Sequence, residues 1–265
     1  MARLTFDGYL THLRDESARF RAVLADCDPE ARVPGCPDWT AADLLWHLAG
    51  VQHFWATIIG NRPTGPEELE EPDRPATYDA LLAAYDDYSA ALVGELEKAD
   101  PAEPAWTWST EQTVGFTFRR QAHEALIHRL DAEQAAGQVT PLDPELAADG
   151  VEEALAVMFG GKPPWGSFAG LPHFVRVDLT DRGESVWVQL GMFSGTDPDS
   201  DTTYTDEPDI DVVADPGTEP DAVVAGTAAG LDAWLWRRGD DADISVTGDR
   251  GIYDRFRGAV NHPIN

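Results

Sequence analysis

Apolar residues in the first 140 positions recur every three or four residues, which is the spacing of an amphipathic helix. Thr40 is a predicted N-cap with Asp43 at the third helical position, as in a capping box, and Gly137 is a predicted helix stop. Loops are predicted at residues 61–76 and 100–112. Four helices of this length joined by loops favour an antiparallel bundle. The predicted helices span residues 4–26, 40–59, 78–98 and 114–136.

After Pro141 the pattern changes to short alternating runs, with one more helix predicted at 144–159. The Thr- and Asp-rich segment 196–209 is predicted to be a solvated loop. The other predicted elements are a hairpin of strands 173–179 and 185–190, a strand at 209–214, a helix at 220–237, a strand at 244–247 and a closing helix at 251–260. We therefore expect an α+β protein, with a helical bundle over residues 1–140 and a small α+β domain over residues 141–265.

Composition narrows the class of protein. The chain has 265 residues, with 19 Lys and Arg against 48 Asp and Glu, for a net charge of −29. Such a surface repels nucleic-acid phosphates and anionic lipids, so we expect neither nucleic acid nor a membrane as a partner. No apolar run reaches the roughly 18 residues of a membrane span, and the N-terminus lacks the apolar core of a signal peptide. A cytoplasmic location is expected, with Cys27 and Cys36 as free thiols.

His47 is the first residue that could carry chemistry. On a helical wheel it lies on the apolar face of its predicted helix, whereas His53 lies away from that face. The apolar residues within about 80° of it are Leu44, Val51, Phe54, Trp55 and Ile58. A histidine in this place is either a core residue with one hydrogen bond or a metal ligand, and the helix pattern alone leaves both open.

Glu124 and His128 are the second candidate, because residues four apart share one face of a helix and can reach one ion. The alternative is an ordinary solvated face, since Arg120, Gln121 and Asp131 fall on the same stripe. With His47 they make a set of two histidines and one glutamate. Catalytic zinc is commonly held by three such ligands with a fourth position open. Facing helices of a bundle often build a metal site in this way.

Three segments carry a resemblance to a known family. PDWTAADLLWHLAG (residues 37–50) resembles the W-T-x-x-D-L-x-x-H-L segment of the DinB-like family of mycothiol-dependent maleylpyruvate isomerases. HEALIHRLDAE (residues 123–133) looks like that family's second signature. LDAWLWRRG (residues 231–239), followed by VTGD (residues 246–249), is similar to its C-terminal domain. The resemblance covers nearly the whole chain.

The resemblance implies a four-helix bundle that holds a divalent metal, usually zinc, with His47, Glu124 and His128 as its ligands. It also implies a sterol-carrier-like α+β domain that supplies a catalytic arginine. The family commonly has Trp-Gly-Arg where this chain has Trp236-Arg237-Arg238. Arg238 is the first choice for that arginine and Arg237 the second. The alternative for both is an arginine that favours the C-terminal end of a helix.

The expected function is that of a metal-dependent enzyme using a low-molecular-weight thiol, mycothiol or a similar one. Its thiolate would add to an activated double bond, as in an isomerase, or be transferred to an electrophile, as in an S-transferase. The substrate would be a small electrophile or an unsaturated dicarboxylate, whose carboxylates an arginine could hold. Metal-assisted hydrolysis is another enzymatic option. The alternatives outside catalysis are a metal-containing ligand-binding protein and a structural helical domain.

Overall fold

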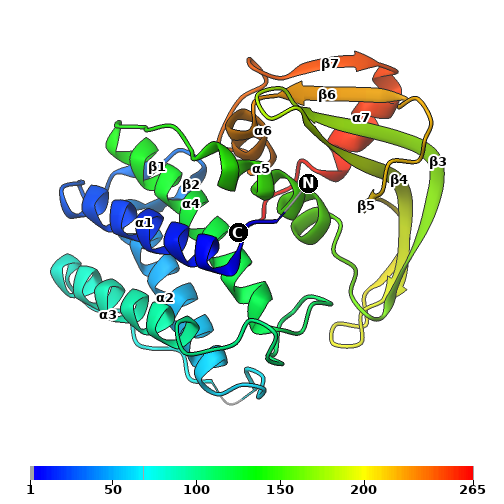
Figure 1. Cartoon of the computed structure of the whole chain (residues 1–265). Coiled ribbons are helices and arrows are strands. Elements are labelled where there is room, and N and C mark those ends of the chain that lie inside the picture. The colour runs from blue at the N-terminus through cyan, green and yellow to red at the C-terminus, as the bar shows by residue number, and fades with distance from the viewer. Residues whose placement is uncertain (1–2, 68, 265) are drawn as a thin grey trace. The chain divides into compact units, whose positions relative to one another are not determined.

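The computed structural model describes residues 3–67 and 69–264 and divides into two compact units (Figure 1). One unit spans Leu4–Leu142 and is mainly helical; the other joins Arg3 to the residues from Asp143 onward and contains a five-stranded sheet. The predicted α+β class, a helical unit followed by a unit with a sheet, is confirmed. Among the described residues, none of the helices combines the length and apolar character that crossing a membrane needs.

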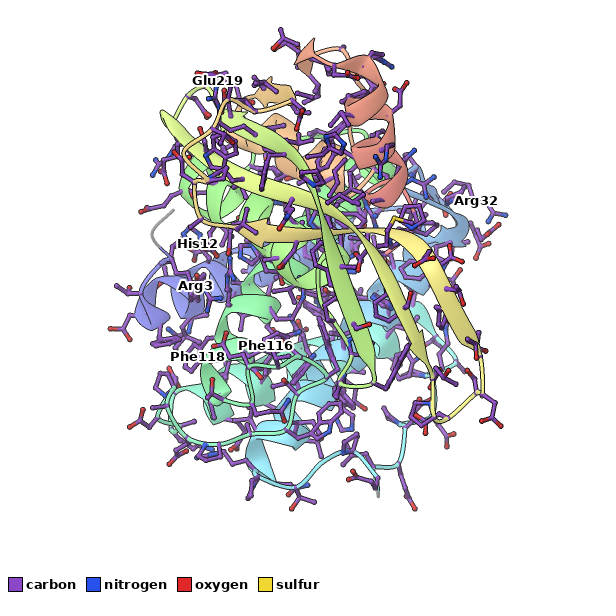
Figure 2. The ribbon with its side chains drawn as sticks, turned by 90° about the vertical axis from the view of Figure 1, so that its right-hand side faces the viewer. Arg3, His12, Arg32, Phe116, Phe118 and Glu219 are labelled. Atoms are coloured by element: carbon purple, nitrogen blue, oxygen red, sulfur yellow. The ribbon has the colours of Figure 1, made fainter. Side chains whose placement is uncertain are left out.

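Four long helices make up the first unit, as the apolar spacing predicts. Each packs against two others: α1 and α2 both contact α3 and α4. The ring contact of Phe6 with Phe118, at 5.6 Å between centroids, joins the starts of α1 and α4. Phe118 and Phe116 are labelled in Figure 2. The helices are α1 (Phe6–Ala25), α2 (Ala41–Gly60), α3 (Tyr78–Leu96) and α4 (Val114–Ala136).

The predicted start of α2 and the predicted end of α4 are both present in the structure. Thr40 Oγ1 accepts from the backbone N–H of Asp43 at 3.2 Å, and Asp43 Oδ2 accepts from the backbone N–H of Thr40 at 2.9 Å. This capping box satisfies two N–H groups that a helix start would otherwise leave unpaired. Gly137 ends α4 with φ 69°, a left-handed conformation that glycine adopts without steric cost.

A short hairpin precedes α2 where the sequence predicts only a Pro-rich turn. Strands β1 (Arg32–Val33) and β2 (Cys36–Thr40) pair antiparallel, and β2 runs directly into the N-cap of α2. Two strands this short have too few residues to show an alternating pattern, so the sequence gives little sign of them. The hairpin fixes the position of Trp39, one residue before the cap.

The second unit builds its sheet in the order β5-β4-β3-β6-β7, antiparallel except for the parallel pair β3–β6. Helix α7 packs against this sheet, and α5 packs against α6 (Figure 1). After α5 the chain continues as a π-helical segment, Ala154–Phe159. The elements are α5 (Pro144–Glu153), β3 (Gly166–Leu179), β4 (Glu184–Thr196), β5 (Thr203–Val213), β6 (Ala222–Gly226), α6 (Ala228–Leu235), β7 (Ser245–Gly248) and α7 (Arg250–Ala259).

Two predictions in this unit are wrong in part. The segment predicted as one helix over 220–237 is a strand, β6, followed by the shorter helix α6. Pairing on both sides, with β3 and β7, makes Val223 and Val224 strand residues. The predicted loop over 196–209 holds the first half of β5. The acidic side chains of this segment break the alternation of apolar and polar residues that predicts a strand. Strand β5 lies at the edge of the sheet, where charged side chains prevent pairing with other chains.

Candidate metal centre

Helices α2 and α4 pack against each other and carry the three residues that the sequence singles out. His47 lies in the second turn of α2, and Glu124 and His128 lie one turn apart in the middle of α4. One side-chain nitrogen or oxygen from each residue lies within 4.8 Å of the other two. Glu124 Oε1 is 3.6 Å from His47 Nε2 and 3.1 Å from His128 Nε2. The fold thus brings together residues 77 positions apart.

The two separations from Glu124 suit a small tetrahedral ion. Bonds of about 2.0–2.1 Å from zinc place two ligand atoms roughly 3.3 Å apart, close to the 3.1 and 3.6 Å found here. His47 Nε2 is buried and makes no hydrogen bond within the described part of the chain. A buried polar atom without a partner costs free energy, and a metal bond at this nitrogen would remove the cost. Two imidazoles and a carboxylate are also a donor set that zinc accepts.

A second layer of contacts orients two of the three candidates. Asp131 Oδ2 lies 3.0 Å from His128 Nδ1, and both side chains are buried. Arg120 Nη2 donates to Glu124 Oε2 at 2.7 Å. The other ring nitrogen of His128, Nε2, and the other oxygen of Glu124, Oε1, therefore face each other in the cluster at 3.1 Å. Partners of this kind are common around metal ligands, where they fix ring orientation and tautomer.

The charges of the cluster are tightly coupled. Burial alone would raise the pKa of Glu124, but Arg120 and the hydrogen bond with His128 hold that pKa well below its usual range. Burial alone would lower the pKa of His128, but hydrogen bonds to Asp131 and Glu124, and their charges, raise it to about 9. Two carboxylates thus converge on one imidazole, and the cluster attracts positive charge.

The stripe on α4 that could have been a solvated face is instead buried. Arg120, Gln121, His128 and Asp131 are each at most 3% exposed, which excludes the solvated-face interpretation. The sequence places Arg120 and Asp131 on this stripe without indicating that they orient the candidate ligands. Trp39 was also missed: its ring centroid lies 4.7 Å from that of His47 and 6.3 Å from that of His128.

A pocket of about 920 Å³ adjoins the cluster at His47. One face of α2, including Trp46, Gly50 and Phe54, forms one side of it, and the loop that includes Leu69 and Arg74 contributes the other. Helix periodicity alone does not predict this pocket, although the spacing of Trp46, Gly50 and Phe54 places them on the same helical face as His47.

The two candidate arginines lie just after α6, in the second unit. Arg238 is half-buried, and its Nη1 donates to the backbone oxygen of Trp236 at 2.7 Å. Arg237 is exposed and has φ 62°, in the left-handed region. The backbone N–H of Arg238 bonds to the oxygen of Ala233 at 2.7 Å, which closes the end of the helix.

Fold and cluster together define a class: a four-helix bundle with a His₂Glu cluster between two of its helices, followed by a unit built on a mixed sheet. Residues 10–133 match the mycothiol maleylpyruvate isomerase N-terminal domain, and residues 145–255 match the MDMPI C-terminal domain. The chain belongs to the mycothiol maleylpyruvate isomerase family.

Individual relatives and structures agree with this assignment. Uncharacterized proteins Rv0738 and MT0763, from two strains of Mycobacterium tuberculosis, are each 31% identical to the chain over 157 residues, which is 57% of this chain and 80% of theirs. Two crystal structures of mycothiol-dependent maleylpyruvate isomerase, one of a histidine-to-alanine mutant, match with a TM-score of 0.56 and 16% identity. They cover 92% of this chain and 93% of theirs. At this identity the likeness shows the fold alone.

Proposed function

We propose that the protein is a metal-dependent enzyme that uses a low-molecular-weight thiol, mycothiol or a similar one, for isomerisation or S-transfer. The observation that carries the proposal is the convergence of His47, Glu124 and His128, whose ligand atoms lie within 4.8 Å of one another. These residues would hold a divalent ion, with zinc the best fit to the donor set. When bound, such an ion lowers the pKa of a thiol at its open position, so that the thiolate is available at neutral pH.

The chain's own side chains prepare this chemistry. Asp131 orients His128, and Arg120 holds one oxygen of Glu124 so that the other faces the cluster. Trp39 packs beside His47, which limits the ring's freedom and keeps water from one side of it. Held rigidly by such neighbours, a site loses little entropy when it takes up its ligands. The identity of the thiol is inferred from the family, whereas the metal-assisted chemistry is inferred from the site itself.

We further propose Arg238 as the catalytic arginine. The left-handed φ of Arg237 is a conformation that glycine favours, and the family commonly has Trp-Gly-Arg in this place. Arg237 therefore stands at the position of the family's glycine, which aligns Arg238 with the family's arginine. A guanidinium can hold a carboxylate or a developing negative charge with two parallel hydrogen bonds.

Metal analysis of the purified full chain tests the proposal. We expect about one divalent ion per chain in the wild type and its loss in His47→Ala, because two ligands hold such an ion far more weakly than three. His12→Ala is the matched control, since His12 lies on α1 (Figure 2) outside the cluster and its variant should keep the metal. A wild type without stoichiometric metal, or equal metal in wild type and His47→Ala, contradicts the metal role.

Thiol turnover decides between an enzyme and a metal-containing ligand-binding protein, which the pocket beside His47 also favours. Metal-loaded protein is mixed with a thiol and either a cis-unsaturated dicarboxylate or an alkylating electrophile. We expect product with one of the two, and a fall in kcat for Arg238→Lys if the carboxylate is held by two hydrogen bonds. Full metal occupancy without turnover of either substrate supports the binding protein instead.

A further inference from the structure

The pocket beside His47 has walls of a definite kind. Trp39, Trp46, Val51 and Phe54 contribute aromatic and aliphatic surface to it. Its volume of about 920 Å³ lies within the range of roughly 300–1,000 Å³ that is typical of small-molecule sites. Aromatic walls favour flat apolar molecules, through burial of their surface and through ring stacking.

The charges around the pocket disfavour an anion. Its lining includes three carboxylates, on Asp43, Glu70 and Glu71, against the one guanidinium of Arg74. That guanidinium is already paired, because Arg74 Nη1 lies 2.7 Å from Asp43 Oδ1. Glu70 and Glu71 are exposed, and no ion pair is found for them among the described residues. A dicarboxylate entering here would meet like charge, and the lining offers no unpaired guanidinium or ammonium to offset it, so the divalent ion proposed at the cluster would have to do so.

Gly50 is a glycine in the interior of α2 that lines the pocket. A Cβ built at this position would meet no atom within 4 Å, so the space above it is open. A glycine inside a helix costs about 0.5–1 kcal/mol relative to alanine, because it orders a freer backbone. The backbone geometry does not require a glycine here, and the missing side chain leaves the floor of the pocket open.

We propose that this pocket binds an uncharged aromatic or apolar molecule, and that Gly50 gives it room. In the proposed function this molecule is the electrophile that reacts with the thiol. The inference that it is a substrate therefore rests on the proposed function. His47 lines the pocket and belongs to the candidate metal cluster, so a molecule bound here lies beside the reactive site.

The test uses two fluorescent probes that share one ring system and differ by a sulfonate. N-phenyl-1-naphthylamine is uncharged, and 8-anilinonaphthalene-1-sulfonate is anionic. Titrated into the full-length protein, the uncharged probe is expected to bind with a blue shift and enhanced emission. Its Kd should be at least about tenfold below that of the sulfonate, a difference of about 1.4 kcal/mol.

Two leucine variants locate the binding. Gly50→Leu fills the open floor and should weaken binding of the uncharged probe by about tenfold or more, since it removes the space for one aromatic ring. Gly94→Leu is the matched control, because Gly94 also lies within a helix, α3, and a Cβ there also meets nothing within 4 Å. Circular dichroism checks that both variants fold, and Gly50→Ala, a smaller addition, should give an intermediate effect.

Tighter binding of the sulfonate would overturn the proposal, as would unchanged binding of the uncharged probe to Gly50→Leu. The probes require neither metal nor thiol, so their result stands apart from that of metal analysis. If the uncharged probe binds but metal analysis finds no metal, the pocket proposal stands and the proposed thiol chemistry is refuted. If the protein holds metal and turns over the thiol but does not bind the uncharged probe, only the proposed substrate class is refuted.

Discussion

Arg129 on α4 offers a sharp test of how the bundle is held together. It is 3% exposed, and its Nε donates to Glu16 Oε2 on α1 at 2.6 Å. Its Nη1 donates to Glu133 Oε2 at 2.9 Å and to the backbone oxygen of Thr140 at 3.2 Å. One guanidinium therefore joins α1, α4 and the segment after α4. Because α4 carries Glu124 and His128, this network also fixes the helix that positions the candidate metal site.

Arg129→Met removes the charge but keeps much of the side-chain volume. Removing one partner of a buried ion pair costs about 3–5 kcal/mol, because the other charge stays buried and unpaired. Glu133 would keep Arg19 Nε at 2.7 Å and the backbone N–H of Thr140 at 2.7 Å. Glu16, 11% exposed at its side chain, has no other ion pair given by the structure within the described residues. We therefore expect a loss of about 3 kcal/mol at neutral pH, the lower end of that range.

The loss should depend on pH. In the wild type, burial already raises the pKa of Glu16 above its ordinary value of 4.5, although Arg129 opposes the shift. Without Arg129 this pKa rises further, and the folded state binds a proton more readily than the unfolded state. Stability is then recovered as pH falls through the raised pKa and lost as pH rises through it. The difference between variant and wild type should be largest near neutral pH and shrink on acidification.

Urea unfolding followed by tryptophan fluorescence measures this difference. Glu16→Met combined with Arg129→Met removes both charges, and we expect the double variant to recover most of the loss, because apolar residues can replace a buried pair with little cost. A loss below about 1 kcal/mol in Arg129→Met would refute the reasoning. So would a double variant no more stable than the single one, since the cost would then come from packing and not from an unpaired charge.

Three further outcomes follow from local geometry. Asp131→Asn should weaken zinc binding about tenfold in a chelator competition, because it removes the charge that orients His128, and unchanged affinity would deny Asp131 that role. Arg237→Gly should raise the free energy of unfolding by about 1 kcal/mol in denaturant titrations, because it relieves a left-handed residue; a loss of stability would contradict this. A hydrogen bond from the backbone of Thr40, together with Arg74, lowers the pKa of Asp43 to about 2. The ionised Asp43 carboxylate therefore stabilises the folded state above pH 3.8, and this stabilisation is lost as pH falls through 2. Asp43→Asn should therefore cost about 1 kcal/mol at neutral pH, a value reduced by solvent screening, and nothing near pH 2, as followed by circular dichroism.

The helical half of the fold was predictable because its signals are local. Thr40, Asp43 and Gly137 act through contacts within a few residues, and the apolar spacing of each helix needs no knowledge of its neighbours. The cluster of His47, Glu124 and His128 was predictable for a different reason. The resemblance to a family supplied the pairing of α2 with α4, which helix periodicity alone leaves open.

Features that depend on tertiary packing were not predictable in the same way. Arg120 and Asp131 are charged residues on a helix, and their composition favours a solvated face, yet both are buried. The strand β6 has the composition of a helix or a buried strand, and only its pairing with β3 and β7 decides between them. The pocket beside His47 is lined in part by residues 69–74 of the loop between α2 and α3, whose path helix periodicity does not predict. Burial, strand pairing and cavity shape are each set by residues distant in sequence.

The net charge of −29 should make turnover of charged and uncharged substrates depend differently on salt. A dianionic substrate approaching a chain of this charge is repelled over a distance that salt shortens, so its kcat/KM should rise with ionic strength. An uncharged electrophile meets no such barrier, and its kcat/KM should stay flat. The carboxylates of Glu70 and Glu71 at the pocket strengthen this contrast, because they add local negative charge where the substrate would enter. Salt dependence of turnover therefore separates the two substrate classes within one family, and the geometry of the pocket favours the uncharged one.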